Sequence, residues 1–435
     1  MSRLRRIELA SLPAGERRAL LRRSAVPDRS VRNGATAVCD DVAERGDEAV
    51  REYADRFGGD FRRVRPDEIA AAVDAVGAKV IEALEAAAAN VRTYHQAQLP
   101  VELEVETVEG VEVSRRWRPL RRVGAYVPGG KASYPSSVIM TVVPAKVAGV
   151  SEVVVTSPAA PDGAVNPATL AACHVAGADE VWIVGGAQAI AALAHGTETV
   201  EPVEKIVGPG NAWVTAAKLA VFGVCSIDLP AGPSEVLVLA DGAADPTLVA
   251  VDLLCQAEHG PDSPAVLVTT DPDLPDRVEV ELDRLLPDLE RSAILEQALT
   301  DHGWAVVVPD HQSAIDFVND YAGEHVTIMT EDPETDAKQV TAAGSVYVGR
   351  WAPESAGDYA TGANHVLPTG GLAAACGPLS VDDFGSWRQV QRITRRGLEN
   401  IVDTISTLAT AEGLTAHRLA AQIRLQQEQT IGRHS

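Results

Sequence analysis

Long apolar runs, paired cysteines and an excess of positive charge are all missing from this 435-residue sequence. Its most apolar stretch, residues 138–150, is broken by Pro144 and Lys146 and is too short to cross a bilayer. The arginine-rich start is interspersed with Glu8 and Glu16 and no apolar run follows, which argues against a secretory signal. We therefore expect a soluble protein that contacts no membrane.

The cysteine content and the charge balance indicate the cellular compartment and exclude one class of partner. The five cysteines form no CxxC pair, and an odd number gives no disulfide framework, so we predict a reducing, cytoplasmic location. Thirty-eight Lys and Arg residues against 61 Asp and Glu residues leave a net charge of −23. Such a field repels the phosphates of nucleic acids, so we expect no nucleic-acid partner.

The glycine fingerprint GxGxxG of dinucleotide-binding folds is also absent. Glycine-rich turns instead follow predicted strands at residues 124–130, 185–188 and 208–211, and two of them lead into a predicted helix whose amide end could receive a phosphate. Each turn taken alone is equally typical of ordinary turn chemistry. If a dinucleotide binds, it does so in a non-standard way.

Hydrophobic periodicity predicts an α/β protein that is long enough for two core-bearing domains. Two helical patterns at 31–57 and 66–98 precede a β-hairpin whose turn is Glu109-Gly110. From Val123 onward, short apolar strands alternate with helices, which indicates parallel sheets in two α/β units. The predicted strands are 153–156, 181–184, 205–207, 236–239, 266–269, 305–308 and 326–329.

The remaining segments mark the unit boundary and the C-terminal tail. The Pro- and Gly-rich run at 229–233 indicates the boundary between the two units. From Ser380 onward the pattern is helical and polar, without a strand. A tail of this kind buries little by itself, so we expect it to dock, for example on a second subunit.

Two short motifs combine residue types that carry chemistry. Gln256 and His259 are three apart at the end of a predicted helix, so both side chains leave one face and can converge on a metal ion. A solvated surface pair is the alternative interpretation. Glu324 and His325 adjoin a predicted strand, where they can act as general bases in a cleft, or else form part of a polar loop.

Two further segments are poorly explained by core packing. Residues 353–371 contain carboxylates, an Asn-His pair and several glycines but little apolar periodicity, which is typical of an ordered functional loop and less so of a flexible surface loop. Near the C-terminus, Thr415 is a good N-cap and places His417 in the first helical turn. The helix dipole favours the neutral imidazole that a metal needs, although an exposed histidine is the simpler interpretation.

Taken together, seven segments resemble the histidinol dehydrogenase family, in that family's order and spacing, over residues 31–427. They are GAYVPGG, YPSSVIMTVVPAKVAGV, VGPGNAWV, IDLPAGPSEVLVLAD, QAEHGPDS, APESAGDYATGANHVLPTGG and EGLTAH. The resemblance implies two Rossmann-like parallel-sheet domains with a small helical C-terminal extension, in an intertwined homodimer whose tail completes the partner's site. The implied domains are 26–122 with 235–379, and 123–234, with helical extensions for dimerisation at 1–25 and 380–435.

The resemblance also implies residue roles. The implied zinc ligands, for one ion per subunit, are Gln256, His259, Asp358 and His417. The implied catalytic bases are Glu324 and His325. Substrate contacts are implied for Ser234, Gln256, His259, His325, Asp358, His365, Glu412 and His417, and NAD contacts for Tyr126, Gln188 and Asn211.

The implied reaction converts L-histidinol, water and two NAD to L-histidine and two NADH through a bound aldehyde, the last steps of histidine biosynthesis. Two positions beside the bases depart from the family: Gly323 stands where proline is usual and Val326 where leucine is common. A relative that oxidises another alcohol, such as a sulfonated propanediol, and a non-catalytic protein stapled by zinc are the competing hypotheses. Manganese or cobalt would suit the same ligands.

Overall fold

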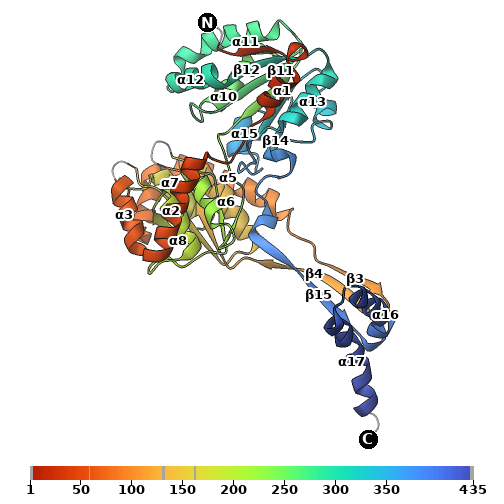
Figure 1. Ribbon diagram of the computed structural model, residues 1–435. Coiled ribbons are helices and arrows are strands. Elements are labelled where there is room, and N and C mark those ends of the chain that lie inside the picture. Colours follow the sequence, from red (N-terminus) through yellow and green to blue (C-terminus); the bar gives the residue numbers. More distant parts are fainter. Residues whose placement is uncertain (1–2, 58, 130–132, 161–162, 432–435) are drawn as a thin grey trace. The chain divides into compact units, whose positions relative to one another are not determined.

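The computed structural model describes residues 3–57, 59–129, 133–160 and 163–431 (Figure 1). The chain divides into two compact units. The first comprises Met1–Gln98 and Leu120–Phe384, and the second comprises Leu99–Pro119 and Gly385–Ser435. Among the described residues, no helix combines the length and the apolar character needed to cross a membrane.

The first unit contains a six-stranded sheet in which all neighbouring strands run parallel. In spatial order its strands are β1 (Arg5–Glu8), β12 (Gly303–Val307), β11 (Ala265–Thr269), β10 (Val236–Ala240), β13 (His325–Met329) and β14 (Ser345–Val348). Side chains alternate between its faces, so that Val236 and Val238 join one buried cluster while Leu237 and Leu239 join another. Such two-sided burial is what near-continuous apolar strands predict.

Helices cover both faces of this sheet (Figure 1). One face carries α10 (Pro246–Ala257), α11 (Leu274–Leu285) and α12 (Ser292–His302). The other carries α1 (Ala14–Leu21) and α13 (His311–Tyr321). The remaining helices near this sheet are α14 (Pro333–Ala337) and α15 (Glu354–Tyr359). Four short 3-10 helices are formed by Leu9–Ser11, Leu286–Asp288, Leu372–Ala374 and Val381–Phe384.

A second six-stranded sheet lies in the same unit and is parallel except for its edge strand β2, which pairs antiparallel with β7. Its spatial order is β2 (Arg62–Arg63), β7 (Glu180–Ile183), β6 (Glu152–Ser157), β5 (Arg122–Tyr126), β8 (Lys205–Val207) and β9 (Ser226–Ile227). One face packs on α4 (Pro66–Val76), α5 (Ala78–Gln96), α6 (Pro135–Ala148) and α7 (Pro167–Ala176). The other packs on α2 (Arg29–Arg45), α3 (Asp47–Phe57), α8 (Gly186–His195) and α9 (Ala212–Val221).

The two sheets share one topology. Apart from the edge strands β1 and β2, the first strand of each sheet is central, the second and third lie to one side, and the fourth and fifth lie to the other, as β7-β6-β5-β8-β9 and β12-β11-β10-β13-β14. This is the doubly wound order of Rossmann-like folds, in which the strand order reverses between the first and fourth strands. The predicted α/β class with parallel sheets is confirmed.

Helices α2 to α5, which lie between β1 and β5 in the chain, do not pack on the sheet to which the resemblance assigned them. Residues 26–122 were assigned to the sheet of 235–379, but α2 to α5 bury their apolar faces on the β5–β9 sheet. Likewise, residues 1–25 are not a separate helical extension, because β1 pairs with β12. The physical reason is that a helix face needs an uncovered sheet face, and α10 to α13 already cover much of the β10–β14 sheet.

The second unit combines a small antiparallel sheet with two helices (Figure 1). Its strands, in spatial order, are β15 (Gly385–Ile393), β4 (Val111–Pro119) and β3 (Leu103–Val108), followed in the chain by α16 (Arg395–Ala411) and α17 (Thr415–Ile431). The β3–β4 hairpin was predicted. The strand β15 was not, and the expectation of no strand beyond Ser380 is wrong: Trp387 pairs with Trp117 across the sheet, and such cross-strand partners lie far away in the sequence.

Two expected long helices are each interrupted by a glycine. The pattern at 31–57 forms α2 and α3, separated at Gly46 (φ 57°), and the pattern at 66–98 forms α4 and α5, separated at Gly77 (φ 79°). Positive φ is readily adopted by glycine and ends a helix. The apolar periodicity continued across both breaks and concealed them.

Candidate active site

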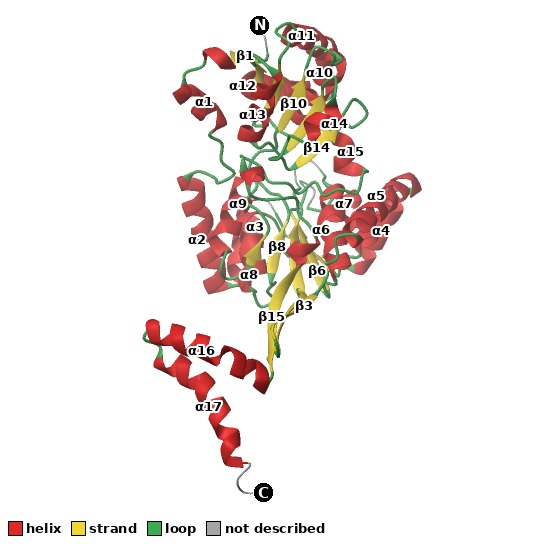
Figure 2. Cartoon of the chain, turned by 90° about the vertical axis from the view of Figure 1, so that its right-hand side faces the viewer, coloured by secondary structure: helices red, strands yellow, loops and turns green. Residues whose placement is uncertain are grey.

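A cavity of about 1030 Å³ lies in the first unit, where loops gather between its two sheets (Figure 2). Nine of the twelve predicted site residues line it: Tyr126, Gln188, Asn211, Ser234, His259, Glu324, His325, Asp358 and His365. The structure thus gathers in one place residues that are separated by up to 239 positions in the chain. Gln256 lies buried on α10, three residues before His259.

Glu324 is held at the amino end of β13. Its Oε2 accepts a hydrogen bond from the Ser234 hydroxyl at 2.6 Å and another from the Glu235 amide at 2.9 Å. Burial raises the pKa of Glu324 well above its usual range, and these two donors oppose that shift. A carboxylate that is desolvated yet oriented by donors is suited to taking a proton.

His325 is the first residue of β13 and is 2 % exposed. Its Nδ1 lies 3.2 Å from the carbonyl oxygen of Glu235, and because a carbonyl only accepts, Nδ1 carries the proton. Burial, followed by the nearby His259, lowers the pKa of His325 to about 3, so its approaches of 3.7 Å to Glu324 and 3.9 Å to Glu354 are not ion pairs at neutral pH. The unprotonated Nε2 is buried without a hydrogen-bond partner. It is therefore free to accept a proton.

A cluster of potential metal ligands lies beside the two bases. His259, Glu354 and Asp358 each offer one ligand atom, and these atoms lie within 4.8 Å of one another. Two of the three were predicted, and Glu354 was missed. Its spacing of four residues from Asp358 was the available signal, because on the helix α15 that spacing places both carboxylates on one side.

Buried groups in this cluster lack the partners that burial demands. Gln256 is 0 % exposed, and neither its Oε1 nor its Nε2 makes a hydrogen bond. Glu354 is also fully buried, and neither of its carboxylate oxygens accepts a hydrogen bond. Burial raises the pKa of Glu354 well above its usual range, and the carboxylates of Asp358 and Glu324 raise it further. A divalent cation would satisfy these groups, and the imidazole and oxygen donors fit zinc, manganese or cobalt.

His365 supports the same cluster from the loop after α15. Its Nδ1 lies 3.2 Å from the carbonyl oxygen of Asp358 and 3.8 Å from that residue's Oδ1. Burial lowers the pKa of His365, whereas Asp358 opposes the shift. The loop predicted at 353–371 is therefore ordered, and its first residues form α15.

The other side of the cavity is formed at the carboxyl ends of the β5–β9 sheet. Tyr126 ends β5, and its hydroxyl accepts a hydrogen bond from the Gly186 amide at the start of α8. Asn211 caps α9 by accepting from the amides of Trp213 and Val214. The turn at 208–211 is fixed by the buried Lys218, which pairs with Asp228 and donates to the carbonyl oxygens of Gly208 and Leu229, each at 2.9 Å. Gly130, at the end of the first glycine-rich turn, lies outside the described residues.

The last two predicted site residues belong to the second unit. Glu412 directly follows α16, and His417 lies in the first turn of α17, which begins at Thr415. Both side chains are exposed. Their predicted roles stay predictions.

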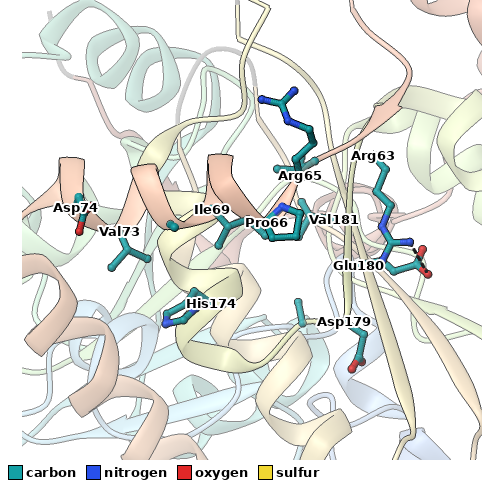
Figure 3. Close-up of a pocket in the computed structure, with 13 residues that line it drawn as sticks. Arg63, Arg65, Pro66, Ile69, Val73, Asp74, His174, Asp179, Glu180 and Val181 are labelled. Atoms are coloured by element: carbon teal, nitrogen blue, oxygen red, sulfur yellow. Dashed lines mark ion pairs between the residues drawn. The ribbon is translucent and has the colours of Figure 1, made fainter.

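A second cavity, of about 640 Å³, lies between α4 and the region after α7 (Figure 3). Ile69 and Val73 of α4 line it together with His174, and the ion pair between Arg63 and Glu180 borders it at 3.5 Å. No predicted site residue is among those that line it. Most of the predicted site residues thus line the larger cavity.

Comparisons with known proteins point to a single family. A family model described as histidinol dehydrogenase matches residues 21–425. The histidinol dehydrogenase of Haloarcula marismortui is 48% identical over 423 residues, covering 96% of this chain and 99% of that protein. That of Halobacterium salinarum is 47% identical, covering 97% and 99%. The crystal structure of histidinol dehydrogenase from Elizabethkingia anophelis aligns with a TM-score of 0.92 at 38% identity and covers 99% of both chains.

Proposed function

The chain belongs to the histidinol dehydrogenase family, and from this premise we propose that it oxidises L-histidinol through L-histidinaldehyde to L-histidine, using two NAD and one zinc ion per subunit. The observation that carries the metal-dependent part is the buried Gln256, whose amide has no hydrogen-bond partner next to the His259, Glu354 and Asp358 cluster. Buried polar groups of folded proteins are nearly always satisfied, so the set is incomplete without an ion.

In this proposal Gln256, His259 and Asp358 hold the zinc, together with His417, which the family pattern assigns to the partner subunit. When bound, the ion would act as a template for the imidazole and amino nitrogens of the substrate, because zinc favours nitrogen donors and is redox-silent. Glu354 belongs to the same cluster and offers the ion a further oxygen atom. Ser234, His365 and Glu412 are further proposed substrate contacts.

The two bases act in different steps of the proposed reaction. His325 accepts the hydroxyl proton of the alcohol at Nε2, the ring nitrogen that has no partner. Glu324 accepts a proton from the water that attacks the aldehyde, because its carboxylate is oriented by Ser234 and the Glu235 amide. Two successive oxidations require a base for the alcohol and one for the water.

NAD is the proposed hydride acceptor and would lie against Tyr126, Gln188 and Asn211, which line the cavity at the carboxyl ends of the β5–β9 sheet. Support comes from the general rule that ligands of doubly wound sheets bind where the strand order reverses. Here the reversal falls between β5 and β8. Tyr126 is the last residue of β5, and the turn before Asn211 directly follows β8.

We further propose an intertwined, cytoplasmic homodimer with shared active sites. Its support is the surface of the second unit, where Leu408, Leu414, Leu419 and Ile423 are between 41% and 58% exposed. Apolar side chains gathered on two paired helices are typical of a subunit interface. The free thiols Cys39, Cys173, Cys225, Cys255 and Cys376 agree with a reducing compartment.

The test is the number of NADH molecules formed per L-histidinol consumed, with and without a chelator. We expect two NADH, and loss of turnover on chelation that zinc restores. Gln256→Ala and His259→Asn should lose both zinc and turnover, whereas the matched control His174→Asn, an exposed histidine at the other cavity, should lose neither. Full activity and zinc content in either site variant would refute the metal site. In a panel of alcohols, preference for a sulfonated propanediol would refute the substrate.

A further inference from the structure

Glu235 lies behind both proposed bases and touches each of them through its main chain. Its amide donates to Glu324 Oε2 at 2.9 Å. Its carbonyl oxygen accepts from the main-chain amide of His325 and lies 3.2 Å from Nδ1 of the same residue. Glu235 directly precedes β10, Glu324 directly precedes the neighbouring β13 and His325 begins it, so the parallel pairing of these strands creates this arrangement. The main chain of one residue therefore orients both bases.

The side chain of Glu235 is itself anchored. It is 3% exposed, and its carboxylate pairs with the guanidinium of Arg23 and accepts a hydrogen bond from the Gly370 amide at 3.1 Å. Gly370 has a φ of 64°, and a side chain there would collide with the main chain at Ser24 and Ala25. The segment after α1 is thus packed closely against the loop that helps to hold Glu235.

Arg23 is fixed from three directions. Besides pairing with Glu235, it donates to the carbonyl oxygen of Tyr321, and its guanidinium carbon lies 3.4 Å from the centre of the Tyr321 ring. Its side chain is 12% exposed. Tyr321 ends α13, three residues before Glu324, so the same arginine ties together the segments that lead into β10 and β13. A planar, multiply donating guanidinium is suited to this task, and an ammonium is less so.

We infer that Arg23, acting through Glu235, is a positioning residue that orients Glu324 and His325 at once. Neither Arg23 nor Glu235 is among the described residues that line the cavity, so both act on the reaction only through the two bases. This inference rests on the base roles proposed above. It goes beyond them by assigning a catalytic consequence to a residue near the N-terminus, more than 200 positions away.

The test measures the alcohol-oxidising and aldehyde-oxidising steps separately in Arg23→Gln, Arg23→Lys and Glu235→Gln. We expect kcat for both steps to fall about 10- to 100-fold in Arg23→Gln and Glu235→Gln, with KM for L-histidinol and zinc content unchanged. Arg23→Lys should recover part of the loss. The double variant should be no slower than the worse single variant, because the pair acts as one unit. Arg22→Gln, which changes the exposed neighbouring arginine, is the matched control.

A purely structural role predicts a different result. Arg23→Gln would then have a lower melting temperature but a kcat within about twofold of the Arg22→Gln control, and this would overturn the inference. Loss confined to one of the two steps would overturn it as well. If Arg23→Gln fails to fold, Glu235→Gln and Arg23→Lys carry the same test. Full activity in Glu324→Gln and His325→Asn would instead refute the base roles themselves, so the two failures are distinguishable.

Discussion

Replacing Gln256 by leucine should stabilise the metal-free protein and weaken the zinc-loaded one. Gln256 is 0 % exposed, and neither polar atom of its amide has a partner. An unsatisfied buried polar group costs about 1–3 kcal/mol, and leucine has a similar size without that penalty. At about 2 °C or more per kcal/mol, the melting temperature in the presence of a chelator should rise measurably.

Zinc should reverse the sign of the effect. A ligand at about 1,000 times its Kd stabilises the folded state by about 4.1 kcal/mol, which exceeds the gain of about 1–3 kcal/mol in the metal-free protein, and the variant loses most of this stabilisation because one proposed ligand is gone. The assay is thermal unfolding of wild type and variant with chelator and with added zinc.

The control for this experiment is Asn364→Leu. The Asn364 amide is buried but satisfied, since it donates to the Met140 carbonyl oxygen at 2.8 Å and accepts from the Val366 amide at 2.9 Å. Its loss should lower the melting temperature by the same amount with or without zinc. Equal destabilisation of Gln256→Leu in both conditions would contradict the reasoning, because Gln256 would then resemble Asn364.

Three further predictions follow from single side chains. Glu324→Gln should slow aldehyde oxidation more than alcohol oxidation, and equal losses measured on the two substrates would contradict the division of roles. Because burial lowers the pKa of His325 to about 3, while an unfolded histidine titrates near about 6.5, the free energy of unfolding should fall as pH falls from about 6.5 towards 3. His325→Asn should remove part of that slope in denaturant titrations of metal-free protein, and an unchanged slope would count against the shift. Lys218→Met should cost about 3–5 kcal/mol by leaving Asp228 buried and unpaired, and Lys218→Met with Asp228→Leu should regain most of it, as denaturant titration can check.

Much of the fold could be predicted from local patterns. The strand at 205–207 has the predicted bounds, because an apolar run flanked by turn residues carries its own signal. The edge strands β1 and β15 could not be predicted in this way. β1 has one buried residue of four, and in β15 most residues are exposed, so neither shows an apolar pattern and each exists only because a distant strand pairs with it.

Some residues of the site could be predicted from the sequence, and others could not. The resemblance named His259, Asp358, Glu324 and His325, and the cavity brings all four together. It assigned no role to Glu354, Arg23 or Glu235. Residue type alone does not reveal such positions. A buried glutamate and an exposed glutamate are identical in a sequence, and only the packing of α15 or β10 distinguishes them.

The strand directions explain why one cavity can serve both binding and chemistry. On the β5–β9 sheet the cavity lies at the carboxyl ends, where Tyr126 ends β5, as expected for a ligand of a doubly wound fold. On the β10–β14 sheet it lies at the amino ends, where His325 begins β13. At this edge the neighbouring strands present main-chain groups such as those of Glu235 to the side chains that precede β13. The carboxyl edge thus suits the proposed dinucleotide, while the amino edge orients the proposed bases, and a variant of Tyr126 should affect NAD binding far more than zinc content.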